Sequence, residues 1–146
     1  MTKKAIVLFL CTGNSCRSQM AEGWAHKLLG LEVDAYSAGI ETHGLNPRAV
    51  QIMSEVDVDI STQESQNIDM YLGLQPDLVV TVCDHAAEVC PTFPAQTHML
   101  HQSFPDPAQA TGTEEEILEK FRSVRDDIKQ FITTLPDIIR NNSKHS

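Results

Sequence analysis

The fold is decided by the stretch Cys11-Thr12-Gly13-Asn14-Ser15-Cys16-Arg17-Ser18. An apolar run, residues 5–10, precedes it and a helical pattern, residues 17–29, follows it, so it predicts a strand–loop–helix junction. The backbone N–H groups of such a loop and the positive end of the helix can bind a tetrahedral oxyanion. Arg17 would close the loop with a planar guanidinium that matches two anion oxygens. Among these donors we expect Cys11 to be a thiolate nucleophile at neutral pH.

The remaining loop residues are predicted to shape the anion site. We expect Gly13 and Asn14 to allow the tight backbone turn, since asparagine tolerates the left-handed conformation. Ser18 can donate a hydrogen bond to the Cys11 thiolate, cap the helix, or do both. We interpret Cys16 as a small structural residue of the loop. The predicted anion-binding set is therefore Thr12, Gly13, Asn14, Ser15, Cys16 and Arg17.

Length and charge narrow the class of protein. We expect the 146 residues to form one domain, 1–146, and a monomer. The net charge of −9 argues against nucleic acid or an anionic membrane as the main partner. The first apolar run is short and stops at the loop, so we interpret it as a buried strand and expect a cytoplasmic protein. In such a chain, four cysteines indicate metal or redox chemistry more than structural disulfides.

Apolar patterning predicts strands that alternate with helices, and therefore an α/β fold with a parallel sheet flanked by helices. The predicted strands are residues 4–10, 33–38, 78–82 and 97–101. The predicted helices are 17–29, 46–55, a short one near 68–72, a helical turn over 84–89, and a long helix that begins at the capping box 113–116. We expect Pro136 to end or kink the last helix and residues 141–146 to fray.

Three candidate catalytic side chains follow three different strands. Cys11 follows the first strand, Cys83 the third, and Asp106 lies in the loop after the fourth. Ligands of open parallel sheets bind beyond the carboxyl ends of the strands, so we expect these residues to converge at one edge. Asp106, between two prolines, is either a turn residue or a general acid.

Beyond these patterns, the Cys11–Arg17 loop resembles the C-x5-R loop of the low-molecular-weight protein tyrosine phosphatases. The resemblance to the thioredoxin-coupled arsenate reductases of that family is closer and covers nearly the whole chain. The similar segments are Cys11–Trp24, Tyr36–Glu41, His43–Pro47, Val56–Ser61, Leu78–Cys83, Cys90–Pro91, Asp106–Ala108, Gly112–Glu116 and Val124–Asp126. The resemblance implies four strands in the order 2-1-3-4.

The resemblance also implies a mechanism. Cys11 would attack arsenate with Asp106 as the acid, Cys83 would then form a disulfide with Cys11, and Cys90 would take over that disulfide by bonding to Cys83. Arsenite would be released, thioredoxin would supply the electrons, and no bound cofactor would be needed. Some members bind a monovalent cation through residues that match Asn14, Glu22 and Ser37 in this chain.

Two other functions stay open at this point. A phosphatase acting on phosphotyrosine or small phosphoesters would use the same loop without Cys83. The phosphatases usually carry tyrosines after the Asp-Pro pair, where this chain has Ala108-Gln109-Ala110, which argues against an aryl substrate. A non-catalytic zinc or thiol module would use Cys83, Cys90, His98 and His101, although six residues between the cysteines is wide for zinc.

The spacing of Cys83 and Cys90 imposes a geometric condition. If residues 83–90 were helical, the two Cα atoms would be about 10 Å apart. A disulfide needs Cα atoms within about 7 Å. The segment is therefore expected either to be a loop or to unwind when the disulfide forms.

Overall fold

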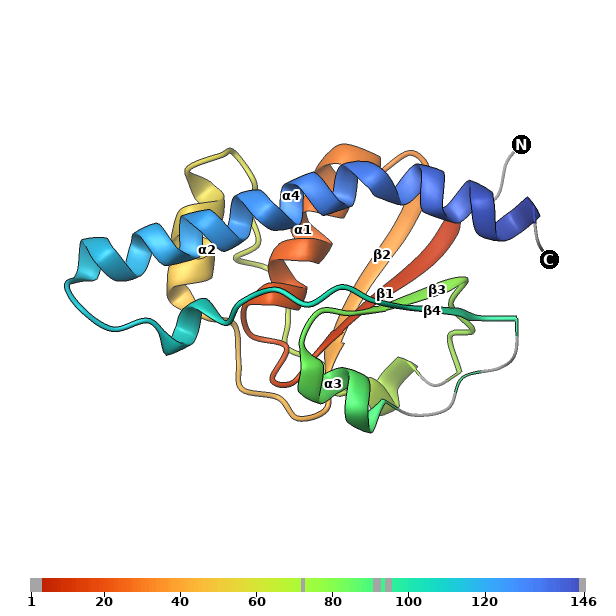
Figure 1. Cartoon of the computed structure of the whole chain (residues 1–146), viewed down its shortest axis with the longest axis horizontal. Coiled ribbons are helices and arrows are strands. Elements are labelled where there is room, and N and C mark those ends of the chain that lie inside the picture. The colour runs from red at the N-terminus through yellow and green to blue at the C-terminus, as the bar shows by residue number, and fades with distance from the viewer. Residues whose placement is uncertain (1–3, 72, 91–92, 94–95, 145–146) are drawn as a thin grey trace.

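The computed structural model describes residues 4–71, 73–90, 93 and 96–144 (Figure 1). Its four strands are β1 (Ala5–Cys11), β2 (Val33–Gly39), β3 (Leu78–Thr81) and β4 (His98–His101). They form one parallel sheet in the order β2-β1-β3-β4. This confirms the predicted sheet and strand order, and it places β1 and β3, which carry Cys11 and Cys83 at their ends, side by side.

The helices fall close to the predicted ranges. They are α1 (Arg17–Leu29), α2 (Pro47–Ser54), α3 (Asp84–Val89) and α4 (Glu114–Lys144), with 3-10 turns at Ile68–Tyr71 and Pro107–Gln109. The predicted caps are confirmed for α2, where Asn46 Oδ1 accepts from Arg48 N at 2.8 Å, and for α4, where Thr113 and Glu116 bond reciprocally at 3.2 Å. Leu72, the end of the predicted short helix, lies outside the described residues.

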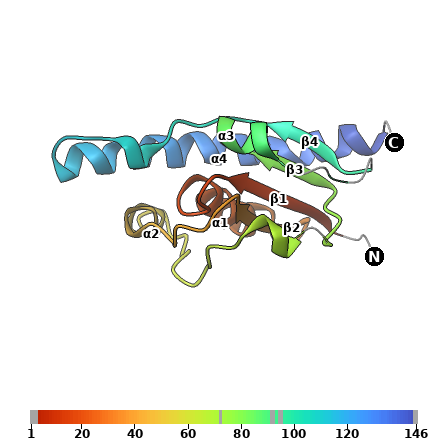
Figure 2. The same ribbon diagram turned by 90° about the horizontal axis from the view of Figure 1, so that it is seen from below.

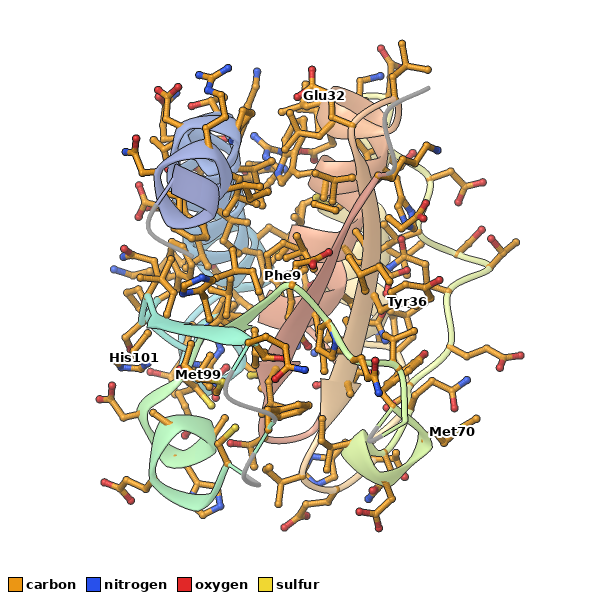
Figure 3. All side chains as sticks on the ribbon, turned by 90° about the vertical axis from the view of Figure 1, so that its right-hand side faces the viewer. Phe9, Glu32, Tyr36, Met70, Met99 and His101 are labelled. Carbon is orange, nitrogen blue, oxygen red and sulfur yellow. The ribbon has the colours of Figure 1, made fainter. Side chains whose placement is uncertain are left out.

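The central strand is buried on both faces. Residues Val7 to Leu10 have no exposed surface, which explains why this strand is continuously apolar instead of alternating. Figure 3 shows Phe9 in the interior, whereas Met99 and His101 lie on the edge strand β4. Contacts of α1 with β1, β2 and α4 join the sheet to the helical layer. Figure 2 shows α4 running past α2, α1 and the sheet along the length of the molecule.

The last helix does not end at Pro136, so this part of the prediction was wrong, whereas a kink there stays a prediction. Helix α4 continues through Pro136 to Lys144, so residues 141–144 are helical, and residues 145–146 lie outside the described residues. The physical reason is burial on both sides of the proline, since Ile132 and Leu135 are fully buried and Ile139 packs against the core. In the turn before the proline, the Thr133 and Thr134 hydroxyls donate to the carbonyls of Gln130 and Phe131 at 2.6 Å.

No helix within the described ranges is both long enough and apolar enough to cross a membrane.

Candidate active site

The backbone of the loop after β1 is fixed from outside by the segment that follows β2. Its outward carbonyls accept N–H donors as follows: Cys11 from Ile40 at 3.2 Å, Thr12 from Glu41 at 2.9 Å, Gly13 from His43 at 3.0 Å and Ser15 from Asn46 at 2.9 Å. Because a trans peptide points its N–H away from its C=O, the N–H groups of the next residues face the opposite side, into the loop. The loop therefore presents backbone donors to an anion.

Asn14 supplies the sharp turn in this loop. Its φ of 48° is in the left-handed region, which confirms the role predicted for it. Its side chain is buried, donates to Ser18 Oγ at 2.8 Å and accepts from Gln66 N at 2.7 Å. Gln19 Nε2 donates to the Asn14 carbonyl at 3.0 Å. The structure thus joins Ser18 to Asn14, and a bond from Ser18 to the Cys11 thiolate stays a prediction.

Gly39, at the end of β2, lets the two segments come together. A Cβ atom at this position would lie 2.8 Å from Asn14 N and 2.3 Å from the Glu41 carbonyl oxygen. Such contacts are too short for any side chain, so only glycine fits where β2 passes the anion loop.

Arg17 is held so that it faces the loop. Its side chain is 12 % exposed, and its Nη1 donates to the Phe104 carbonyl at 2.9 Å. Nη2 lies 3.6 Å from Asp106 Oδ2. Its Nε is buried and has no hydrogen-bond partner among the described residues. A buried, unpaired donor is costly unless a ligand uses it, so Nε indicates an oxyanion site.

Asp106 caps a turn with one carboxylate oxygen and faces Arg17 with the other. Oδ1 accepts from Ala108 N at 3.0 Å and so caps the 3-10 turn, whereas Oδ2 faces Arg17. The side chain is 31 % exposed, which allows exchange of protons with water. It therefore lies within reach of a ligand held by Arg17, as a general acid requires.

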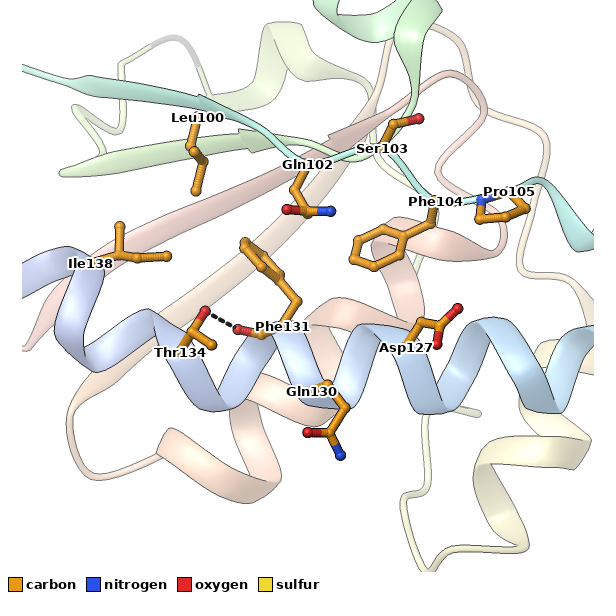
Figure 4. A pocket seen from close by; sticks show the side chains of 10 residues that line it. All are labelled: Leu100, Gln102, Ser103, Phe104, Pro105, Asp127, Gln130, Phe131, Thr134 and Ile138. Atoms are coloured by element: carbon orange, nitrogen blue, oxygen red, sulfur yellow. Dashed lines mark hydrogen bonds between the residues drawn. The ribbon is translucent and has the colours of Figure 1, made fainter.

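The chain before Asp106 is anchored on α4. The Phe104 ring is buried and packs edge-on against Phe131, with ring centroids 6.0 Å apart. The two rings line a groove of about 540 Å³ between this segment and α4. Figure 4 shows both side chains between the two elements. The groove is lined by none of the cysteines and does not include the anion loop. Its contribution to the site is to hold the Phe104 carbonyl where Arg17 binds it.

The second thiol lies at the nucleophile. Cys83 Sγ is 3.2 Å from the hydroxyl of Thr12, the residue next to Cys11, so the second thiol lies beside the first. The nearby Cys83 sulfur and burial raise the pKa of Cys11, whereas Arg17 lowers it. The nearby Cys11 thiol, the Thr12 hydroxyl and the amide of Ala86 lower the pKa of Cys83 to about 5. The direction of the pKa shift at Cys11 is opposite to the one expected from the sequence, because the neighbouring Cys83 and burial outweigh the effect of Arg17.

The other two cysteines differ from this pair. Cys16 is buried, and burial with the nearby Asp106 carboxylate raises its pKa to about 12, in keeping with a structural role. Cys90 is half-buried, and burial raises its pKa. It directly follows α3, whereas Cys83 directly precedes that helix. All four cysteines are free.

The predicted cation residues are already engaged with one another or with N–H donors. Ser37 Oγ donates to Glu22 Oε1 at 2.7 Å, and both oxygens of Asn14 accept N–H donors. Burial raises the pKa of Glu22. Binding of a monovalent cation by these oxygens stays a prediction. Within the described ranges, His, Cys, Asp and Glu side chains also form no group of three or more that could hold a metal ion.

Three contacts of the site were missed by the sequence analysis. They are the Phe104 carbonyl on Arg17, the Thr12 hydroxyl on Cys83, and the pairing of His101 Nε2 with Asp84 Oδ1 at 2.9 Å. The first two depend on where separate loops meet and leave no pattern in the sequence. The third could have been suspected, since Asp84 follows β3 and His101 ends β4 at the same edge of the sheet.

Comparison with known sequences gives relatives along almost the whole chain. The family described as low molecular weight phosphotyrosine protein phosphatase matches residues 6–145. An arsenate reductase of Halalkalibacterium halodurans is 56% identical over 134 residues, 92% of this chain and 96% of that protein. An arsenate reductase of Bacillus subtilis is also 56% identical, over 133 residues, 88% of this chain and 96% of that protein.

Solved structures give the same result for the fold. An arsenate reductase in its oxidized state superposes with a TM-score of 0.79 at 32% sequence identity, over 92% of this chain and 98% of that one. A tyrosine phosphatase of Erwinia amylovora superposes with a TM-score of 0.75 at 19% identity, over 94% of each chain. At this identity the similarity supports the fold but not the activity.

Proposed function

This chain belongs to the low molecular weight phosphotyrosine protein phosphatase family, and within it we propose that the protein is an arsenate reductase, which converts arsenate to arsenite. One observation carries the proposal: the Cys83 sulfur lies 3.2 Å from the hydroxyl of Thr12, the residue next to the nucleophile Cys11, at the ends of the paired strands β1 and β3. Hydrolysis of a phosphoester needs one thiol and no electrons, whereas reduction needs a second thiol to remove the oxidised first one. The relatives that are arsenate reductases at 56% identity support the same assignment.

Arsenate would bind in the loop after β1. The inward N–H groups, the start of α1 and the free Nε of Arg17 form a positive site in a protein whose net charge is −9. This local positive charge explains how an acidic chain can bind an anion.

The first chemical step would join Cys11 to arsenic. As the S–As bond forms, one arsenate oxygen leaves as water, with Asp106 placed to deliver a proton to it. The Cys11 thiol would lose its proton to the nearby Cys83 sulfur as it attacks, and Cys83 would release that proton to water before the second step. Arg17 would stabilise the charge on the arsenate oxygens.

The second step would reduce arsenic. Cys83, as a thiolate, attacks the Cys11 sulfur, and the electron pair of the S–As bond stays on arsenic, which leaves as arsenite. Cys90, as a thiolate, then attacks the Cys83 sulfur of the Cys11–Cys83 disulfide and releases Cys11 as a thiolate. The last disulfide, Cys83–Cys90, would be reduced by a dithiol protein of the thioredoxin class in the cytoplasm. Throughout, two electrons pass from the thiols to arsenic.

A phosphatase acting on phosphorylated protein or small phosphoesters is the competing function, because phosphate and arsenate have nearly the same shape. The variant Cys83→Ser separates the two functions. We expect it to lose multiple-turnover arsenate reduction with a thioredoxin system while any hydrolysis of an aryl phosphate persists. Hydrolysis serves as the internal control that the loop is intact. Arsenate reduction at the wild-type rate in this variant would overturn the proposal.

A further inference from the structure

Helix α3 lies between the two thiols that would form the last disulfide. Cys83 is its N-cap residue and Cys90 its C-cap residue. Seven helical steps place their Cα atoms about 10 Å apart, whereas a disulfide needs about 7 Å or less. If the proposed relay operates, α3 has to unwind before the Cys90 sulfur can reach Cys83. Whatever holds α3 together therefore opposes that step.

Few apolar contacts hold this helix. Among its described side chains only Ala86 is buried, while Asp84, His85, Ala87 and Glu88 are exposed. A helix of six residues is not stable from its own hydrogen bonds. Polar contacts to neighbouring elements are therefore a large part of what keeps it folded.

The main such contact joins the first residue of α3 to the edge strand. His101 Nε2 donates to Asp84 Oδ1 at 2.9 Å, and His101 Nδ1 lies 2.8 Å from Thr81 Oγ1, which fixes the ring on β3. The imidazole, with the Ser103 hydroxyl, lowers the pKa of Asp84, so this carboxylate stays charged. Asp84 is thus tied to the segment between His101 and Asp106.

The other end of this segment contacts Arg17 of the anion site. The Phe104 carbonyl accepts from Arg17, and Asp106 faces that guanidinium. The chain from His101 to Asp106 therefore connects the start of α3 with the acid and the arginine of the site. The contact is positioned to keep Cys83 beside Cys11 during the first disulfide.

We propose that the Asp84–His101 contact controls how fast α3 unwinds, and so sets the rate at which the disulfide passes from Cys11–Cys83 to Cys83–Cys90. Asp84 and His101 are positioning residues, since neither reacts with substrate or sulfur. The inference rests on the proposed function. In the step concerned, the Cys90 thiolate bonds to the Cys83 sulfur and Cys11 leaves as a thiolate, so the number of electrons on the protein does not change.

The contact is exposed, which limits its expected effect. The Asp84 side chain is 80% exposed and that of His101 41%. Exposed charged pairs of this kind change an equilibrium by a factor of about 1.5 to 5. Because the contact is lost when α3 unwinds, its removal should speed the transfer by about this factor and leave the first disulfide unaffected.

A double-mutant cycle tests this inference. Reduced wild-type protein, Asp84→Ala, His101→Ala and the double variant are each mixed with arsenate, quenched with an alkylating agent, and their disulfides quantified by mass spectrometry over time. We expect each single variant to convert Cys11–Cys83 to Cys83–Cys90 about 1.5- to fivefold faster, and the double variant no faster than the quicker single one. Asp84→Asn, which keeps an acceptor for His101, should lie between wild type and Asp84→Ala.

A control variant on the same helix shows whether the effect is specific to the Asp84–His101 contact. Glu88→Gln removes a charge from the same helix without touching His101, and its transfer rate should match the wild type. Equal transfer rates in all variants, or single effects that add in the double variant, would overturn the inference. If wild-type protein forms no arsenate-dependent disulfide at all, the proposed function fails instead.

Discussion

Replacement of Thr12 by valine tests how the second thiol is activated. The Thr12 hydroxyl lies 3.2 Å from the Cys83 sulfur and helps to lower its pKa to about 5. Valine keeps the shape and removes the donor. A hydrogen bond to a charged group contributes about 1.5–3 kcal/mol, or about one to two pKa units. We therefore expect the Cys83 pKa to rise to about 6–7.

The consequence for pH dependence follows from the sign of this shift. Cys83 reacts as the thiolate, so its reactivity is lost as the pH falls through its pKa. In wild-type protein this loss should occur near pH 5, and in Thr12→Val about one to two pH units higher. At pH 6 the variant should therefore form the Cys11–Cys83 disulfide more slowly, whereas at pH 8 the difference should be small.

The assay is alkylation of Cys83 over a pH series, with the modified peptide quantified by mass spectrometry. Thr133→Val, which removes an exposed hydroxyl on α4 that donates to Gln130, is the matched control and should leave the profile unchanged. A midpoint in Thr12→Val that stays near that of the wild type would refute the assignment of Thr12 as a donor to the Cys83 thiolate.

Three further predictions concern the acid, the core and α3. Asp106→Asn should slow formation of the first disulfide about 10²–10⁴-fold, measured by rapid quench, and an unchanged rate would exclude Asp106 as the acid. Trp24→Phe should lower the free energy of unfolding by about 1–3 kcal/mol in urea titrations, because its buried Nε1 donates to the Arg125 carbonyl at 3.1 Å; equal midpoints would contradict this. Protein trapped with the Cys83–Cys90 disulfide should lose amide protection across α3 in hydrogen exchange, and identical protection in both redox states would show that no unwinding occurs.

The sequence predicted the elements that depend on local patterns. The apolar strand before Cys11, the cap at Asn46 and the left-handed Asn14 all have local physical causes, and the structure contains each of them. The strand order came from resemblance to a family, because periodicity does not say which strands pair. Cys11 and Cys83 were predicted to lie close together because each follows a parallel strand. The structure pairs these two strands, β1 and β3, as neighbours.

Features that depend on long-range packing were not predictable. Helix α4 continues past Pro136 because the burial of apolar side chains on both sides outweighs the tendency of proline to break a helix. The hydrogen bond between Arg17 and the Phe104 carbonyl depends on how Phe104 packs against α4. In both cases, contacts between residues far apart in the chain decide the structure, and local sequence patterns do not reveal such contacts.

The most direct test of the sulfur relay is disulfide mapping of Cys90→Ser after one exposure to arsenate. Without Cys90, the relay should stop at its first disulfide, so the account predicts one arsenite released per protein and a Cys11–Cys83 disulfide in nearly all molecules. Arsenite release without that disulfide, or a disulfide that links Cys11 to Cys16 instead, would contradict the account.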